Sequence, residues 1–173
     1  IETPGTGQGV QLTLDADVQR LCEGIAGLTM ERGCIVVMDT RTGEILASVS
    51  MPEYDPNNVA ESIRADDTSL INRTLSPFSA GSVFKVVLAV AAYENGLDGF
   101  THTCTGSVEV AGQTYRCAQG RAHGTVNLRQ ALEQSCNCYF VELGQILGGD
   151  AILQEAEKFG FGRPCAVAPG LKS

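Results

Sequence analysis

The feature that most constrains the fold is an almost uniformly apolar segment that follows Ser79-Ala80-Gly81-Ser82. Residues 83–92 contain a single polar side chain, Lys85, among Val, Phe, Leu and Ala. A helix that is apolar on all sides must be buried, and Gly96 is typical of a helix end. With 173 residues, 43% of them hydrophobic, the chain has enough apolar material for one core around such a helix.

Ser82 and Lys85 form the first candidate catalytic pair. Residues three apart lie on the same face of a helix, and a serine hydroxyl becomes nucleophilic when a base lies next to it. Burial lowers the pKa of a lysine toward the range in which it can act as that base. In the alternative, Ser82 only caps the helix and Lys85 extends to the surface. An ammonium group is costly in apolar surroundings, which favours the catalytic interpretation.

Ser135-Cys136-Asn137 supplies a second pair of polar side chains. Asn127 and Gln130 are arranged like a capping box at the start of a short helix before it, and an apolar helix follows from Tyr139. A hydroxyl and a carboxamide two residues apart can point the same way from a break between two helices. Without the first pair, Ser135 would be interpreted as a turn residue and Asn137 as a cap.

Elsewhere the pattern predicts both strands and helices. A strand is expected at residues 10–14, followed by a helix that Asp15 caps and that runs to about Leu28. Residues 34–39 and 44–50 should form a hairpin, and residues 107–115 a second one around Ala111-Gly112. Residues 1–57 would then hold the sheet hairpin and first helix, and residues 58–173 a mainly helical part. This is an α+β organisation.

The chain resembles the transpeptidase domain of penicillin-binding proteins, most closely the N-terminal part of that domain in the class B enzymes. Residues 82–85 match its S-x-x-K motif, and residues 135–137 match the first and third positions of its S-D-N motif. Ala80 stands where the family usually has proline. Other matching segments extend over nearly the whole chain: residues 10–15, 33–39, 42–47, 51–57, 72–73 and 123–134.

The resemblance implies an incomplete transpeptidase fold, in which residues 1–173 form a single partial domain with a helical subdomain on an antiparallel sheet. The family's third motif, K-[ST]-G on a strand, has no counterpart, because Lys172-Ser173 lacks the glycine and lies too close to Asn137. We therefore expect this piece to be inactive or very slow by itself, since half of the oxyanion hole would be missing.

The resemblance also implies an activity, which is cross-linking of peptidoglycan stem peptides by a D,D-transpeptidase. Ser82 would attack the carbonyl between the last two D-alanines, with Lys85 as the base. Ser135 would relay a proton to the leaving group, and Asn137 would hold the substrate amide. β-Lactams would bind the same residues and acylate Ser82. No cofactor is required for this chemistry.

Other functions remain alternatives. Within the enzymes these are a serine β-lactamase, a D,D-carboxypeptidase or a β-lactam sensor, and outside them a non-catalytic binding module of a cell-wall complex. A net charge of −8 disfavours nucleic acid as a partner. The resemblance implies partners among glycan polymerases and the proteins of cell division or elongation. It also implies a place on the outer face of the bacterial cytoplasmic membrane, with an anchor upstream of Ile1.

Seven cysteines are more than this architecture requires. Four of them, Cys22, Cys34, Cys136 and Cys138, are expected to be small buried hydrophobic residues. Cys104 and Cys117 flank the second hairpin, and His123 follows six residues later. Three alternatives stay open here: a zinc site with a fourth ligand such as His102, Asp98 or water, a Cys104–Cys117 disulfide, or unpaired thiols. The odd number of cysteines disfavours a fully oxidised framework. A resemblance to penicillin-binding proteins of anaerobic bacteria that hold zinc near the active-site groove favours the metal.

Overall fold

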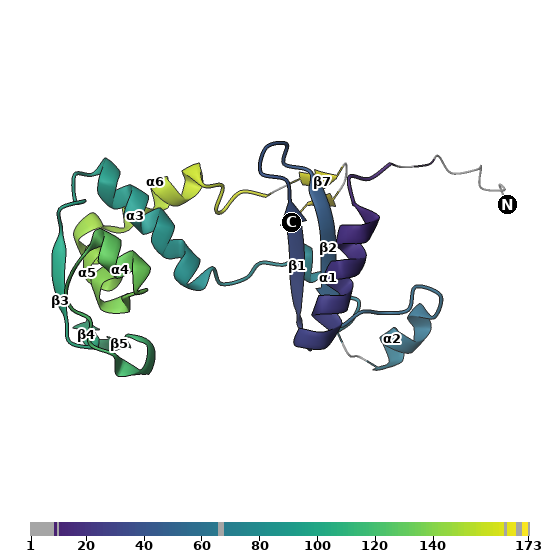
Figure 1. Cartoon of the computed structure of the whole chain (residues 1–173), viewed down its shortest axis with the longest axis horizontal. Helices are drawn as coiled ribbons and strands as arrows, with labels where there is room; N and C mark the ends of the chain where they lie inside the picture. Colours follow the sequence, from purple (N-terminus) through teal and green to yellow (C-terminus); the bar gives the residue numbers. More distant parts are fainter. Residues whose placement is uncertain (1–8, 10, 66–67, 165, 169–170, 173) are drawn as a thin grey trace. The chain divides into compact units, whose positions relative to one another are not determined.

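The computed structural model describes residues 9, 11–65, 68–164, 166–168 and 171–172 (Figure 1). These residues fold into helices and two-stranded antiparallel ribbons, which confirms the α+β class. They form two compact units, residues 1–77 with 165–173 and residues 78–164. The expectation that residues 1–173 form one partial domain, divided near residue 57, stays a prediction. No helix among the described residues is both long enough and apolar enough to cross a membrane.

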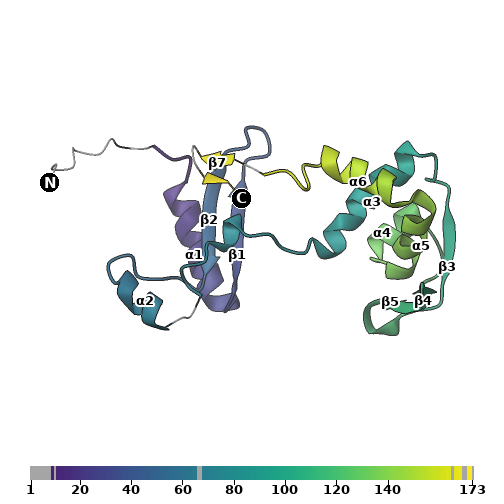
Figure 2. The ribbon, with the colours of Figure 1, turned by 180° about the vertical axis from the view of Figure 1, so that it is seen from behind.

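The first unit is built on a hairpin and one helix. Strands β1 (Gly33–Met38) and β2 (Ile45–Met51) pair antiparallel, and helix α1 (Ala16–Thr29) lies along this ribbon in both Figure 1 and Figure 2. The Asp15 carboxylate accepts hydrogen bonds from two backbone N–H groups of the first turn of α1, which confirms the expected cap. The buried core between helix and ribbon consists of Cys22, Ala26, Ala47 and Val49.

Short elements complete this unit. They are α2 (Val59–Ala65), a 3-10 turn (Arg73–Leu75), β7 (Ala166–Ala168) and β8 (Leu171–Lys172). Strands β7 and β8 pair antiparallel with each other.

The strand expected at residues 10–14 is wrong for residues 11–14, which have no regular structure. They are nevertheless tied to β2. The Thr13 hydroxyl donates to the Ile45 carbonyl at 2.6 Å, and the backbone N–H of Asp15 donates to the Leu46 carbonyl at 2.9 Å. The Thr13 hydroxyl thus makes a contact with β2 that a backbone hydrogen bond would make in a regular strand pair. Residue 10 lies outside the described residues.

The second unit packs helices against short ribbons. Its helices are α3 (Phe84–Glu94), α4 (Leu128–Glu133), α5 (Asn137–Leu147) and α6 (Gly149–Lys158). Its strands are β3 (Thr101–Cys104), β4 (Ser107–Val110), β5 (Gln113–Arg116) and β6 (Gly124–Asn127). Strand β3 pairs with β6, and β4 pairs with β5 as expected. Helix α5 supplies the largest buried side chains of the core, with Tyr139, Phe140 and Leu143 all less than 5% exposed.

Candidate active site and thiol cluster

Ser82 lies in a single 3-10 turn, Gly81–Val83, that leads directly into α3. The turn begins at Gly81 with φ of +59°, a conformation that suits glycine. Lys85 follows in the first turn of α3 and is only 8% exposed although it carries an ammonium group. Burial at this position agrees with the apolar pattern of the helix and shows that Lys85 does not extend to the surface.

Ser135 occupies a left-handed position at the end of α4. Its φ is +51°, its N–H donates to the Leu132 carbonyl, and the N–H of Cys136 donates to the Ala131 carbonyl. This pair of bonds is the Schellman pattern, in which the left-handed residue is usually glycine. Helix α5 begins two residues later, at Asn137. The segment Ser135-Cys136-Asn137 is therefore the joint between α4 and α5.

The Lys85 ammonium group joins the two candidate pairs. Its Nζ lies 3.3 Å from Ser82 Oγ, 2.8 Å from Ser135 Oγ and 2.6 Å from Asn137 Oδ1, and it also donates to the Ser135 carbonyl at 2.9 Å. The Ser135 hydroxyl donates to Ser82 Oγ at 3.1 Å. Two hydroxyls, an amine and a carboxamide that are up to 55 residues apart in the sequence therefore share one set of hydrogen bonds.

Asn137 is held from two sides. Its Oδ1 accepts from Lys85, and its Nδ2 donates to the carbonyl of Arg116 at the end of β5 at 2.8 Å. The second bond fixes which end of the carboxamide faces Lys85.

Burial lowers the pKa of Lys85 from its ordinary value, against an opposing influence of the Cys117 and Cys136 thiols. A lysine with a lowered pKa is deprotonated more readily, and its neutral amine can accept the proton of a neighbouring hydroxyl. The geometry therefore suits nucleophilic acyl transfer, in which Ser82 Oγ attacks a carbonyl carbon and its proton passes to Lys85. Ser135 lies where it can exchange a proton with Lys85.

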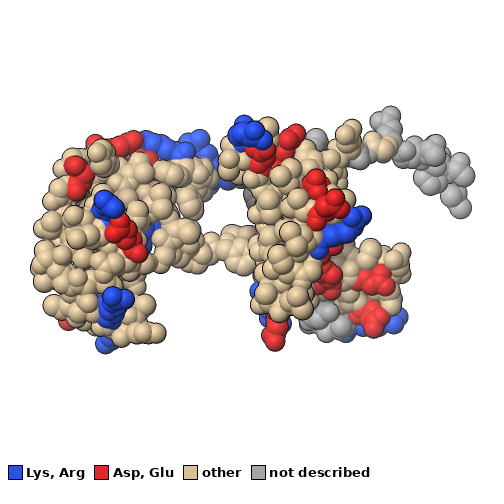
Figure 3. Space-filling view, in the orientation of Figure 1, with Lys and Arg blue, Asp and Glu red and all other residues tan. Residues whose placement is uncertain are grey.

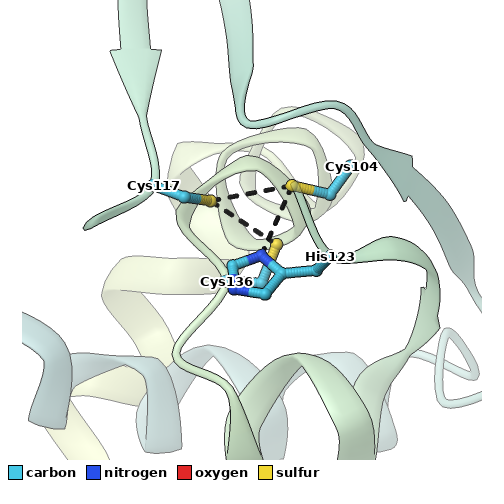
Figure 4. A group of neighbouring side chains, drawn as sticks. All are labelled: Cys104, Cys117, His123 and Cys136. Atoms are coloured by element: carbon cyan, nitrogen blue, oxygen red, sulfur yellow. Dashed lines mark hydrogen bonds between the residues drawn. The ribbon is translucent and has the colours of Figure 1, made fainter. Parts of the chain in front are cut away.

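A cluster of thiols lies beside this site (Figure 4). One ligand atom from each of Cys104, Cys117, His123 and Cys136 lies within 4.8 Å of the other three, which makes the group able to hold a metal ion. These residues come from the end of β3, the residue after β5, the residue before β6 and the cap of α5. Cys138 also approaches the cluster, with its Sγ 3.5 Å from Cys117 Sγ.

The cluster thiols differ in their pKa values. Burial raises the pKa of Cys104, but hydrogen bonds from the backbone N–H groups of His123 and Gly106 and from the His123 side chain outweigh it and bring the value to about 6. Burial raises the pKa of Cys136 to about 12 and also raises that of Cys138. Cys104 is therefore the thiol that ionises most readily among these three.

Cys136 is the functional candidate that the sequence pattern missed. Cys136 is buried in the core as expected, but it also stands in the four-atom group in place of the expected His102, Asp98 or water. Cys104 and Cys117 are free thiols in the structure, with 3.7 Å between their sulfur atoms. The position of Cys136 between two candidate catalytic residues was the one signal in the sequence. Cys165 lies outside the described residues.

The family model of the penicillin-binding protein transpeptidase domain matches residues 33–169. The chain belongs to this family. Among curated relatives, it is 31% identical to stage V sporulation protein D of Bacillus subtilis and 33% identical to the peptidoglycan D,D-transpeptidase MrdA of Escherichia coli K12. The alignments cover 95% and 92% of this chain but only 26% and 27% of those proteins. The chain thus spans about a quarter of the length of the curated relatives it matches.

Solved structures of the family share the fold. The D,D-transpeptidase domain of a peptidoglycan glycosyltransferase from Eggerthella lenta is 32% identical, with a TM-score of 0.78 over 87% of this chain and 37% of that one. Penicillin-binding protein A of M. tuberculosis, in a penicillin G acyl-enzyme complex, is 28% identical with a TM-score of 0.80 over 93% of this chain and 42% of that one. These likenesses confirm the expected family and the incomplete transpeptidase fold.

The surface agrees with the acidic composition. On the face shown in Figure 3, Lys and Arg side chains lie interspersed with Asp and Glu. Such a distribution does not favour binding to the phosphates of a nucleic acid.

Proposed function

We propose that the protein to which this chain belongs is a D,D-transpeptidase that cross-links peptidoglycan stem peptides through an acyl-enzyme on Ser82. The observation that carries the proposal is the position of the buried Lys85 amine, which lies within hydrogen-bond distance of Ser82, Ser135 and Asn137. Two relatives are named peptidoglycan D,D-transpeptidases, which supports the same chemistry.

The reaction proceeds in two acyl transfers. In the first, Ser82 Oγ attacks the carbonyl carbon between the last two D-alanines while neutral Lys85 takes the hydroxyl proton. The backbone N–H of Ser82 donates to the oxyanion that forms. As the carbon–nitrogen bond breaks, Ser135 passes a proton from Lys85 to the departing D-alanine amine. Asn137 holds the amide of the stem peptide.

In the second transfer, the amine of another stem peptide attacks the acyl-enzyme. It loses a proton through the same hydroxyl and amine groups, and Ser82 leaves with its proton restored. A β-lactam enters the first transfer in place of the D-alanyl-D-alanine end, and the acyl-enzyme that results hydrolyses slowly. The penicillin G acyl-enzyme of the M. tuberculosis relative supports this step. All of these roles belong to side chains and backbone groups, so the proposed chemistry calls for no cofactor.

The family relationship supports a place in cell-wall synthesis. We infer that the domain acts on the outer face of the bacterial cytoplasmic membrane, where its peptidoglycan substrate lies. In this role the protein would bind a glycan polymerase and the proteins of cell division, elongation or sporulation. The names of the sporulation and MrdA relatives support this choice.

Covalent labelling with a fluorescent penicillin tests the assignment. We expect one label per molecule of the full-length protein to which this chain belongs, placed on Ser82 by mass spectrometry of peptides, whereas residues 1–173 alone should label very slowly or not at all. The variant Ser82→Ala should not label, because loss of a nucleophilic serine costs on the order of 10⁶ in rate. Ser79→Ala, three residues earlier in the same segment, is the matched control and should label normally. Equal labelling of wild type and Ser82→Ala would remove the proposed nucleophile.

The same experiment separates the alternatives. A serine β-lactamase would release hydrolysed penicillin in many turnovers, whereas a transpeptidase or a β-lactam sensor holds the label. A binding module that does no chemistry would show no label on any residue. Release of D-alanine from a pentapeptide substrate then distinguishes the transpeptidase and the carboxypeptidase from a sensor.

A further inference from the structure

The turn that carries Ser82 is weakly held by its own residues. Neither Ala80, which precedes the turn, nor Val83, which precedes α3, provides a side-chain hydrogen bond as a cap. Val83 is 70% exposed. A hollow of about 440 Å³ lies against the same segment, and its lining consists of Phe78, Ser79, Ala80, Gly81, Phe84 and Phe161. The position of Ser82 therefore depends on what holds the residues that follow it.

Phe84 holds the end of this turn through an aromatic contact. It lies between Ser82 and Lys85 in the sequence. Its ring meets the ring of Phe161 edge to face, with 5.4 Å between the centroids and 86° between the planes. This geometry is favoured because the positive edge of one ring lies against the negative face of the other. The contact joins the start of α3 to the segment that follows α6.

The end of α6 fixes Phe161 in place. Gly160 has a left-handed φ of +86°, and its N–H donates to the Glu157 carbonyl at 3.0 Å. The N–H of Phe161 donates to the Ala156 carbonyl, also at 3.0 Å. These two bonds form a Schellman motif, in which the residue after the left-handed glycine often makes a hydrophobic contact with its own helix. Here the Phe161 ring instead contacts Phe84 of α3.

Helix α6 is also tied to the other end of α3. Lys158, in the last turn of α6, forms ion pairs with Glu94 at the end of α3 and, at 2.7 Å, with Glu155. Glu155 is only 4% exposed. Helix α6 packs against α3, and the two lie side by side in Figure 1 and Figure 2. The segment from Lys158 to Phe161 thus contacts both ends of α3, which gives the Phe161 ring a fixed support.

We propose that Phe161 is a positioning residue for the acyl transfer, and that its contact with Phe84 sets the distance between Ser82 and Lys85. The proposal rests on the proposed function for the role of Ser82 as the nucleophile. Of the hydrogen bonds that Lys85 Nζ makes, the one to Ser82 Oγ is the longest, at 3.3 Å against 2.6–2.9 Å for the others.

The length of this bond explains why the support matters. Without the Phe161 ring, the turn is free to move into the adjoining hollow, and Ser82 Oγ then leaves hydrogen-bond range of Lys85. A misplacement of about 1 Å in a reacting group, caused by a change far from the chemistry, can cost about 100-fold in rate.

Rapid-mixing kinetics of the full-length protein with penicillin test the proposal. A series of penicillin concentrations separates the dissociation constant of the non-covalent complex from the acylation rate constant. Phe161→Ala should lower the acylation rate constant about 10- to 100-fold and leave the dissociation constant nearly unchanged. Phe161→Tyr keeps the ring and should restore most of the rate. An acylation rate constant equal to that of the wild type, or a loss confined to the dissociation constant, would overturn the proposal.

Phe159→Ala is the matched control. Phe159 lies at the end of the same helix and is 49% exposed, against 42% for Phe161. It forms no aromatic pair among the residues that the structure describes. Its acylation rate constant should stay close to that of the wild type. If Phe159→Ala slows acylation as much as Phe161→Ala, the effect comes from general loss of an apolar side chain and the positioning role is wrong.

A second measurement does not depend on acylation. In the ¹⁵N-labelled 173-residue chain, Phe161→Ala should lower the backbone order parameters of Ser82 and Val83, because the turn loses its support. Phe159→Ala should leave them unchanged. Order parameters in Phe161→Ala equal to those of the wild type would overturn the proposal even if acylation were slow. A wild-type protein that does not label with penicillin would instead remove the proposed function, and the order parameters would still decide whether Phe161 holds the turn.

Discussion

The Nζ atom of Lys85 lies 2.6 Å from Oδ1 of Asn137, although 52 residues separate them in the chain. The contact anchors a buried ammonium group that also reaches the hydroxyls of Ser82 and Ser135. It joins the beginning of α3 to the beginning of α5, the two helices that carry or adjoin every residue of the proposed acyl-transfer site.

The pKa of Lys85 predicts how acylation depends on pH. Burial lowers this pKa below the ordinary lysine value of 10.5. Since only the neutral amine can accept the Ser82 proton, the rate of penicillin labelling should rise with pH and level off above an apparent pKa that is lower than 10.5. Stopped-flow labelling across a pH series measures it. Lys85→Arg should not label, because a guanidinium stays protonated throughout. A rate that falls as pH rises would contradict the role of Lys85 as the base.

Asn137→Asp should shift the rise in labelling rate to higher pH. A carboxylate at this position would form an ion pair with Lys85, favour its charged form and raise its pKa. It would also lose the donor that Asn137 Nδ2 provides to the Arg116 carbonyl. We expect slower labelling at neutral pH with partial recovery at alkaline pH. Asn137→Ala is the control, since it removes the amide without adding charge and should slow labelling at every pH. Identical profiles for the two variants would contradict the ion-pair argument.

Ser135→Gly should be more stable than Ser135→Ala, and both should impair the reaction. Both variants lose the hydroxyl and its hydrogen bonds to Lys85 and Ser82, but only glycine relieves the left-handed strain at φ of +51°, so after its own entropic cost it should gain about 0.5–1 kcal/mol over alanine in the free energy of unfolding. Chemical denaturation measures this change. Ser135→Ala keeps the strain and removes the same hydroxyl, so it should label as slowly as Ser135→Gly without being more stable than the wild type. Equal stability of the two variants would show that the Schellman position carries no strain.

Gly106→Ala should disrupt the loop that backs Cys104. An added Cβ would lie 2.3 Å from the Gly120 carbonyl oxygen, and φ is +101°. The combined clash and strain should cost about 3 kcal/mol or more in the free energy of unfolding. Gly112→Ala is the matched control, because its φ of +77° is also left-handed but no atom lies within 4 Å of the added Cβ. It should cost only about 1 kcal/mol. A similar loss in both variants would mean that the close approach at Gly106 does not matter.

Features of local origin could be predicted from the sequence. The Ser82/Lys85 spacing, the Asn127/Gln130 capping box and the β1–β2 and β4–β5 hairpins all depend on residues a few positions apart. Helix and strand propensity, capping and turn geometry act over that range, so the residues that produce these features can be recognised in the sequence. The same reasoning correctly placed Lys85 in apolar surroundings. It was wrong that the helix is buried on all sides, because Val83 and Val86 are 70% and 46% exposed.

Features that depend on distant residues were decided by the tertiary structure alone. The thiol of Cys136 is apolar enough to resemble a core residue, and only the pairing of β3 with β6 and the return of the chain after β5 bring Cys104, Cys117 and His123 to it. Ser135 adopts a left-handed conformation that its residue type does not favour, because the two helices on either side of it fix the joint. Sequence thus determined which side chains the chain offers and which helices carry them. Their meeting in space followed from packing between segments, which no local pattern records.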